Sequence, residues 1–146
     1  MIAEPIFATK EEIHKTFRSH QLKSTQLRKQ PIADRKKLLR NFSDFILSNR
    51  DRIVNAIHQD FKKPLMEVDL SEIYPVLSEL RHAIEKLDQW TASQKIDAPL
   101  TYLGTRSKVV VEPKGACLII APWNYPFSLC FGQLVSCLAA GNTTII

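Results

Sequence analysis

One asparagine between aromatic residues and prolines is the part of this sequence whose residue types could do chemistry. Asn124 stands between Trp123 and Tyr125, and Pro122 and Pro126 flank these three residues. Because proline fixes its own backbone, two prolines restrict this segment strongly. A carboxamide held rigidly can donate a hydrogen bond to an oxygen that gains negative charge during a reaction. Asn is also a common turn residue that bonds its own backbone, and residue types alone leave this second interpretation open.

The elements around this segment predict where it lies. Residues 116–120 are continuously apolar, as is typical of a strand buried on both faces of a parallel sheet. A helix is expected over about 127–140, where Gly141 and Asn142 stop it, and residues 143–146 predict a second strand. Ligands bind at the carboxyl ends of the strands in open α/β sheets. The Asn124 turn is therefore expected at a ligand-binding edge, although no Gly-x-Gly-x-x-Gly follows the first strand.

Helical patterns fill the first two-thirds of the chain. Apolar residues at three- and four-residue steps predict one long amphipathic helix over 31–58 and a shorter helix near 10–28. A third helix is expected over 67–90, where Pro75 should kink or restart it and Trp90 should lie in the core. Short β runs follow, with a strand expected at 108–112.

These elements together predict an α/β protein. N-terminal helices lead into the first strand–helix–strand of an incomplete doubly wound (Rossmann-like) domain. A parallel sheet needs several such units, and 146 residues supply barely one.

Composition excludes several other classes of protein. The net charge of +5 comes from dispersed Lys and Arg residues at helical spacing, which favours solvated helix faces over a nucleic-acid interface. No signal peptide, membrane span or metal-ligand spacing is visible, so we expect a cytoplasmic protein without a metal. The three cysteines, Cys117, Cys130 and Cys137, lie in a predicted strand and helix and are expected to be buried, unreactive thiols. The acidic residues Glu67, Asp69 and Glu72 are expected to complement a helix dipole.

Residues 112–127, from Glu-Pro-Lys-Gly through Pro-Trp-Asn-Tyr-Pro-Phe, resemble the aldehyde dehydrogenase superfamily, as does Leu-Ala-Ala-Gly-Asn-Thr at 138–143. The upstream Asp-Phe-Lys-Lys-Pro at 60–64 fits the same pattern. The resemblance covers roughly residues 30–146 and is greatest to the class 3 and coniferyl-type subgroup, which acts on medium-chain and aromatic aldehydes. Residues 1–29 carry none of it. Gln133 and Cys137 depart from the family pattern in the packing of one helix.

The resemblance implies roles for particular residues. Asn124 would be the catalytic side-chain donor of the oxyanion hole. The residues before it would line the nicotinamide side of a site for NAD or NADP: Ile120, Ala121, Pro122 and Trp123.

The resemblance also implies a division of the chain and a reaction. Residues 1–94 would be a helical segment, 95–115 a linker and strand region of the oligomerisation type, and 116–146 the truncated start of the NAD(P)-binding domain. The complete protein, expected as a homodimer, would oxidise aldehydes to carboxylic acids through a Cys thiohemiacetal. The nucleophilic Cys and the general-base Glu would lie beyond Ile146, so this chain alone would be inactive.

Two other functions stay open at this point. The helices of residues 10–94 could form a non-enzymatic interaction module, although such a module has no need of the Pro-Trp-Asn-Tyr-Pro turn. A relative on the same fold could instead reduce an acyl-CoA or an acyl phosphate.

Overall fold

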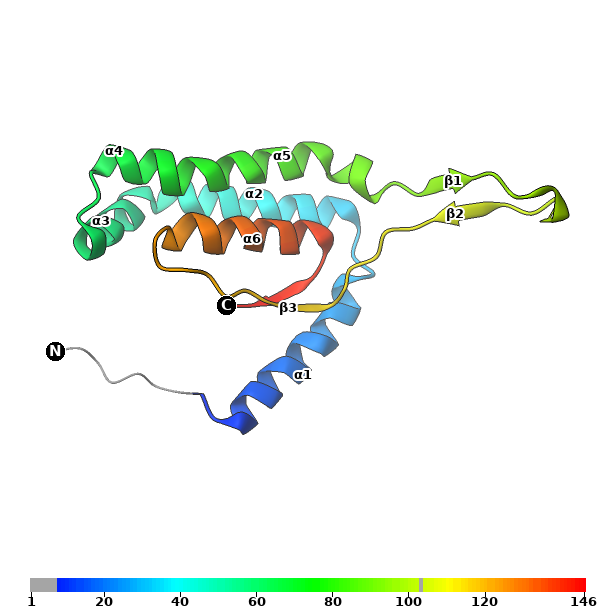
Figure 1. Ribbon diagram of the computed structural model, residues 1–146, viewed down its shortest axis with the longest axis horizontal. Helices are drawn as coiled ribbons and strands as arrows, with labels where there is room; N and C mark the ends of the chain where they lie inside the picture. The colour runs from blue at the N-terminus through cyan, green and yellow to red at the C-terminus, as the bar shows by residue number, and fades with distance from the viewer. Residues whose placement is uncertain (1–7, 103) are drawn as a thin grey trace.

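Three helices packed side by side form the body of the computed structural model, which describes residues 8–102 and 104–146. These are α2 (Ile32–Ser48), α5 (Tyr74–Thr91) and α6 (Pro126–Ala140). Each of them contacts the other two, and Figure 1 shows them nearly aligned. Their shared core joins the helical part of the chain to the region that carries the Asn124 turn. Its most deeply buried side chains include Leu39, Ile46, Leu80, Leu87 and Val135.

A small parallel sheet lies between α6 and a separate helix, α1 (Lys10–Leu27) (Figure 1). The strands are β3 (Ala116–Leu118) and β4 (Thr143–Ile145), with Ala116 opposite Thr143 and Leu118 opposite Ile145. Because α6 connects two parallel strands, the predicted strand–helix–strand unit is confirmed. The expected burial of residues 116–120 is wrong: Ile119 is buried, but Leu118 and Ile120 are 66% and 86% exposed.

Local signals set the ends of α1 and α6 where the sequence predicted them. Thr9 and Glu12 form a reciprocal capping box, in which each side chain accepts a hydrogen bond from the other residue's backbone N–H. Pro126 occupies the first turn of α6. Gly141 ends that helix in the left-handed conformation, with φ of 84°.

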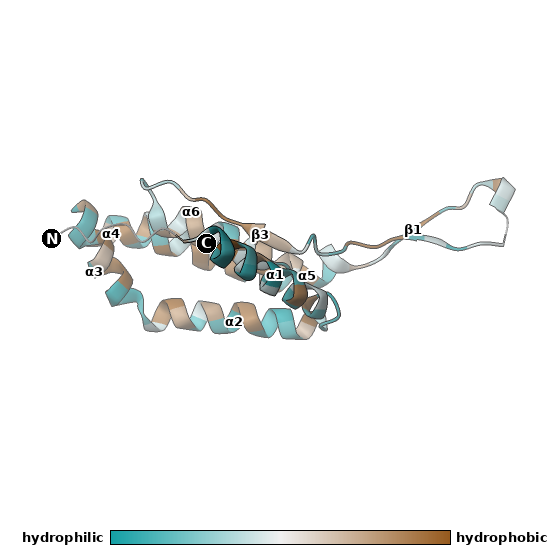
Figure 2. Ribbon diagram, turned by 90° about the horizontal axis from the view of Figure 1, so that it is seen from below, coloured by the Kyte–Doolittle hydropathy of each residue, from teal (hydrophilic) through white to brown (hydrophobic). Residues whose placement is uncertain are grey.

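The long helix predicted over residues 31–58 is broken. α2 ends at Ser48, and α3 (Arg50–Phe61) begins after Asn49, whose φ and ψ are −109° and 12°. The Asn49 side chain donates a hydrogen bond to the Phe45 carbonyl at 2.9 Å. Asn side chains compete with the helical backbone in this way. The apolar residues of α2 alternate with hydrophilic ones along its whole length (Figure 2).

A π-helical turn precedes the third long helix. The chain passes from α4 (Leu65–Val68) through η1 (Asp69–Ile73), a π-helix, into α5. Pro75 lies in the first turn of α5, directly after the change from π- to α-helix, and the backbone stays helical through Ile73 and Tyr74. Trp90, expected in the core, is instead 45% exposed and packs edge-on against His82, with 5.3 Å between the ring centres.

Between α5 and β3 the chain forms an arm that extends away from the helices (Figures 1 and 2). Strands β1 (Gln94–Ile96) and β2 (Ser107–Val109) pair antiparallel, and a short 3-10 helix, η2 (Leu100–Tyr102), lies between them. The strand predicted at 108–112 therefore starts one residue earlier and ends at Val109. In the part of the chain that the structure describes, no helix is long and apolar enough to cross a membrane.

Candidate functional site

The segment from Ile120 to Tyr125 leaves the carboxyl end of β3 and leads into α6. The Ile119 N–H donates to the Ile145 carbonyl at 2.9 Å, which extends the strand pairing by one residue before the chain turns away. The turn thus begins where two parallel strands end. Open α/β sheets bind their ligands at this edge.

Asn124 lies at the surface of this turn with its carboxamide available. Its side chain makes no hydrogen bond with any of the residues that the structure describes, and the residue is exposed. The alternative interpretation, in which the side chain bonds its own backbone, therefore does not describe this turn. The backbone of Asn124, in contrast, is held in place: its carbonyl accepts a hydrogen bond from Lys63 Nζ at 2.9 Å.

The four residues expected at the cofactor site are continuous with Asn124 and mostly open. Ile120 and Trp123 are 86% and 83% exposed, Pro122 is exposed, and Ala121 is partly buried. Trp123 also lines an apolar hollow of about 450 Å³ between α2, α3 and α6. The other lining residues are Phe45, Ile53, Ala56, Ile57, Asp60, Phe61, Pro126, Phe127 and Phe131.

Two charged side chains from outside the Pro-Trp-Asn-Tyr-Pro segment hold this turn, and the sequence interpretation missed this role of both. Lys63 Nζ donates to Glu72 Oε1 at 2.7 Å as well as to the Asn124 carbonyl. Glu72 Oε2 accepts from the backbone N–H groups of Phe127 and Ser128 at 3.1 and 3.0 Å. Glu72 therefore caps α6, a helix distant in sequence, and not its own.

The sequence contained a signal for Glu72. Glu72 lies four residues after Val68 and four residues before Val76, so it shares one side of the helical region with two apolar residues. Both valines are buried in the structure. A carboxylate on an apolar stripe must find partners or pay a large desolvation cost. Asp69, by contrast, pairs at the surface with Arg50.

The opposite end of α6 also receives a charged side chain. The buried Arg35 guanidinium donates from Nη1 to the Ala140 carbonyl at 3.3 Å, and burial lowers the pKa of this group. A cation at a helix C-terminus interacts favourably with the unpaired carbonyls there. A Cβ atom on the adjacent Gly141 would lie 2.5 Å from Arg35 Cζ, so a larger residue at position 141 would displace the guanidinium group.

Two of the three cysteines, Cys117 and Cys130, have the character of unreactive thiols, although only Cys130 is fully buried. Cys130 is buried, whereas Cys117 and Cys137 are partly exposed, which corrects the expectation for those two. Burial raises the pKa of Cys130. Burial, together with the neighbouring Cys137, also raises the pKa of Cys117. A raised pKa reduces the thiolate, which is the nucleophilic form.

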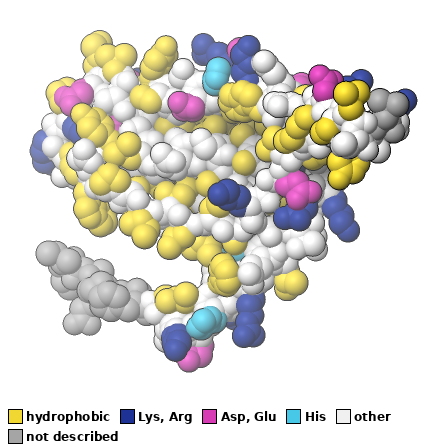
Figure 3. Space-filling model, turned by 45° about the vertical axis from the view of Figure 1, so that its right-hand side comes forward, with side chains coloured by type: hydrophobic (Ala, Val, Ile, Leu, Met, Phe, Trp, Pro, Cys, Tyr) yellow, Lys and Arg dark blue, Asp and Glu magenta, His cyan; other side chains and the backbone are white. Residues whose placement is uncertain are grey.

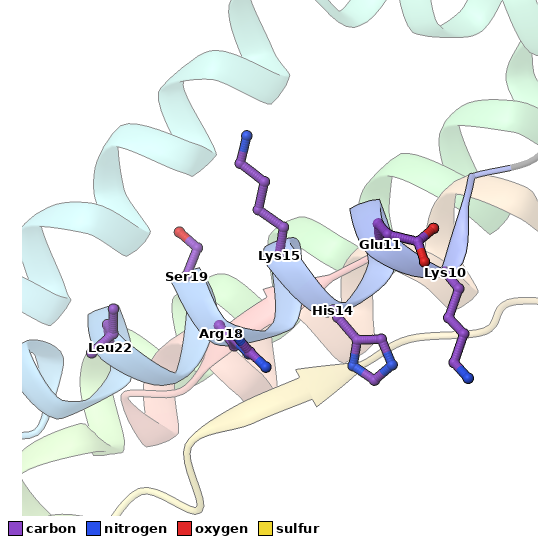
Figure 4. Close-up of a pocket in the computed structure, with 7 residues that line it drawn as sticks. All are labelled: Lys10, Glu11, His14, Lys15, Arg18, Ser19 and Leu22. Atoms are coloured by element: carbon purple, nitrogen blue, oxygen red, sulfur yellow. The ribbon is translucent and has the colours of Figure 1, made fainter.

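The described parts of the chain contain no second group of side chains that forms a candidate functional site comparable to the Asn124 turn. Residues 8–102 and 104–146 hold no group of three His, Cys, Asp or Glu side chains that could bind a metal ion. A hollow along α1 is lined by that helix alone. Figure 4 shows its Lys15 and His14 side chains pointing to opposite sides of the helix, so they do not converge on a ligand.

Comparison with known proteins identifies the family of the chain. The sequence pattern that defines the aldehyde dehydrogenase family matches residues 1–146. This match includes residues 1–29, in which the motifs alone showed no resemblance. The 4,4'-diaponeurosporen-aldehyde dehydrogenase of Staphylococcus aureus is 40% identical over 79% of the chain and 25% of its own length. Aldehyde dehydrogenase family 3 member F1 of Arabidopsis thaliana is 33% identical over 92% of the chain and 26% of its own length.

A solved structure of Staphylococcus aureus AldH in a substrate-bound state superimposes with a TM-score of 0.86 and 36% identity, covering 92% of this chain and 29% of that one. The chain spans about a quarter to a third of the length of the curated relatives that it matches. The whole-length family match, the class 3 relatives and the shared fold lead to one conclusion: the chain belongs to the aldehyde dehydrogenase family.

Proposed function

We propose that this chain is the amino-terminal part of an NAD(P)-dependent aldehyde dehydrogenase, in which Asn124 is a catalytic oxyanion donor. The observation that carries the proposal is the Asn124 carboxamide, exposed and free of partners on a turn whose backbone is fixed. In the complete protein, a Cys thiolate attacks the aldehyde carbon, and the carbonyl oxygen gains negative charge. A donor already in place stabilises that charge without reorganising during the reaction.

The edge beside Asn124 fits a nicotinamide cofactor. Residues 120–123 form an exposed segment at the carboxyl ends of parallel strands, and Ile120 offers an apolar side chain there. We assign the site to NAD or NADP, which would accept the hydride when bound. The contribution of this chain is to provide one wall of the site, largely through backbone and apolar surface.

Exposed apolar surface supports a larger functional protein. Hydrophobic side chains, in yellow, cover much of the face shown in Figure 3. Exposed apolar residues occur on helices and strands alike, including Phe45, Leu70, Tyr74, Leu118 and Ile120. Extended exposed apolar surface marks sites of further contact. We propose that the remainder of the dehydrogenase covers it and supplies the nucleophilic Cys and the general-base Glu.

The arm formed by β1 and β2 supports a role in assembly. Both strands are exposed throughout, and apolar residues line the arm, among them Ile96, Val109 and Val110. An exposed two-stranded ribbon leaves backbone hydrogen-bonding groups available for another chain. We propose that residues 95–115 contact a second copy in a homodimer, between a helical segment (1–94) and the start of the cofactor domain (116–146).

Steady-state kinetics of Asn124→Ala in the complete protein test the catalytic assignment. Loss of one oxyanion donor typically lowers kcat about 100- to 1,000-fold, and we expect that loss with nearly unchanged cofactor affinity and melting temperature. Asn124→Asp is the matched control, because the carboxylate has the same shape but donates no hydrogen bond. It should be at least as defective as the Ala variant. A variant with full turnover and lowered stability would show that Asn124 serves only the turn.

A further inference from the structure

We propose that Lys63 and Glu72 are positioning residues, which hold the Asn124 turn in the geometry that oxyanion stabilisation requires. This inference rests on the proposed role of Asn124. Neither residue touches the free carboxamide itself. They act instead on the backbone at the Asn124 carbonyl and at the start of α6, three and four residues further on.

Lys63 fixes the turn at two adjacent residues. Its Nζ donates to the Asn124 carbonyl at 2.9 Å and lies 4.0 Å from the centre of the Tyr125 ring. A cation over an aromatic face is attracted by the ring electrons. The ammonium group therefore restrains both the peptide that follows Asn124 and the side chain next to it.

Glu72 fixes the turn from its other end. One carboxylate oxygen accepts the Phe127 and Ser128 N–H groups, and the other accepts from Lys63. Those two N–H groups belong to the first turn of α6, where backbone donors lack helical partners. Together the two side chains connect both ends of the segment 124–128 through one ion pair.

Burial makes this ion pair rigid. The Glu72 side chain is fully buried, and the Lys63 side chain is only 14% exposed. A buried charge is tolerated when it is paired and its remaining hydrogen-bonding capacity is used, and removal of one partner leaves the other uncompensated. The pair thus favours a single arrangement of the turn, unlike the exposed ion pairs of this chain.

The backbone next to Lys63 and the backbone that carries Glu72 both adopt conformations that bring the two side chains together. α3 ends at Phe61, and Lys62, which caps it, is the only described residue other than glycine with positive φ, 56°. Such a conformation is uncommon for a residue with a side chain. His58 Nδ1 lies 2.6 Å from the Lys63 carbonyl and restrains the next residue. The π-turn η1 buries Glu72 and Ile73 consecutively, which places the carboxylate toward α6.

Small displacements of a catalytic group lower the reaction rate strongly, so the arrangement of this turn should affect kcat. A misplacement of about 1 Å, caused by a change away from the reacting atoms, can lower a rate about 100-fold. Because the Asn124 side chain has no partners of its own, its direction depends on the backbone that Lys63 and Glu72 restrain. Loss of the pair should therefore lower kcat through Asn124.

Lys63→Met in the complete protein is the test variant, with Arg50→Met as the matched control. Arg50 also pairs with a carboxylate of η1, that of Asp69, but it does not contact the turn. We expect Lys63→Met to lower kcat about 10- to 100-fold, with the KM for the aldehyde and the Kd for the cofactor within about threefold of wild type. Arg50→Met should keep wild-type kcat, and Lys63→Arg, which restores a charged donor, should recover most of the loss.

A double variant separates positioning from other roles. If Lys63 acts through Asn124, Lys63→Met should change kcat less than threefold when Asn124 is already Ala. An undiminished loss in that background would overturn the inference. Full turnover by Asn124→Ala would refute the proposed function and this inference with it. A defective Asn124→Ala beside a fully active Lys63→Met would refute the positioning role alone.

A second variant covers a failure of Lys63→Met to fold. Lys63→Met combined with Glu72→Gln removes both charges, and the Gln carbonyl can still accept the Phe127 and Ser128 N–H groups. This protein should be folded and show the same 10- to 100-fold loss of kcat. Wild-type kcat per folded molecule would overturn the proposal.

Discussion

Gly141 gives a measurable test of how the carboxyl end of α6 is built. Replacement by Ala places a Cβ 2.5–2.8 Å from three guanidinium atoms of Arg35, at a residue whose φ is 84°. A non-glycine residue in the left-handed region costs about 1–2 kcal/mol. Displacement of Arg35 also weakens its hydrogen bond to the Ala140 carbonyl, and bonds of charged groups contribute about 1.5–3 kcal/mol. Since this bond is long, we expect a total loss of about 2–4 kcal/mol.

Thermal unfolding of the complete protein measures this loss. A loss of 1 kcal/mol lowers the Tm of a domain of 150–250 residues by about 2–4 °C, and that of a larger unfolding unit by less. The Tm of Gly141→Ala should therefore fall by no more than roughly 16 °C. Gly132→Ala is the control, because Gly132 lies inside α6 with no atom within 4 Å of the added Cβ. That change should raise stability by up to about 1 kcal/mol.

The two contributions can be separated with Arg35→Ala. In that background the contact with the guanidinium is gone, so Gly141→Ala should cost only the backbone term of about 1–2 kcal/mol. Wild-type stability of the single variant Gly141→Ala would refute the reasoning. A loss as large in Gly132→Ala would refute it too, since it would show a general sensitivity of α6 to added volume.

Two further predictions concern chemistry. The 146-residue chain by itself should form no NADH or NADPH from any aldehyde, because we assign the nucleophile and the base to other parts of the protein; cofactor reduction followed at 340 nm in the purified chain would contradict that assignment. Alkylation of Cys130 by iodoacetamide should be slow near pH 7 and accelerate as the pH rises, because burial raises the pKa of this thiol and only the thiolate reacts. Peptide mass spectrometry across a pH series measures the rate, and labelling as fast as that of a small free thiol at pH 7 would show Cys130 to be accessible.

Elements with local end signals were predictable from the sequence. The start of α1 depends on Thr9 and Glu12, three residues apart, and the end of α6 depends on Gly141. The Asn124 turn was found for a similar reason. Its prolines, its aromatic residues and the apolar strand before it are neighbours in sequence, so one short segment carries the whole signal.

Features that depend on distant contacts were not predictable. The role of Glu72 needs α6, which lies more than 50 residues away in the chain, and a π-turn that shifts the helical period. A prediction that assumes 3.6 residues per turn throughout does not detect this change of helical period. The break at Asn49 was missed because the apolar pattern continues across it, although the Asn side chain interrupts the helical backbone.

The charged side chains at the two ends of α6 also limit how this chain can tolerate insertions and deletions. Glu72 contacts the first turn of the helix and Arg35 the last carbonyl, and α6 fits between them at 15 residues. One added residue would lengthen the helix by about 1.5 Å and rotate everything beyond it by about 100°. The longer helix could then keep its contact with Glu72 or its contact with Arg35, but not both. Among the described residues of the arm, β1 and β2 are exposed along their length and lie between no such pair of caps, so length variation among relatives should accumulate at the turn that joins them and be absent from α6.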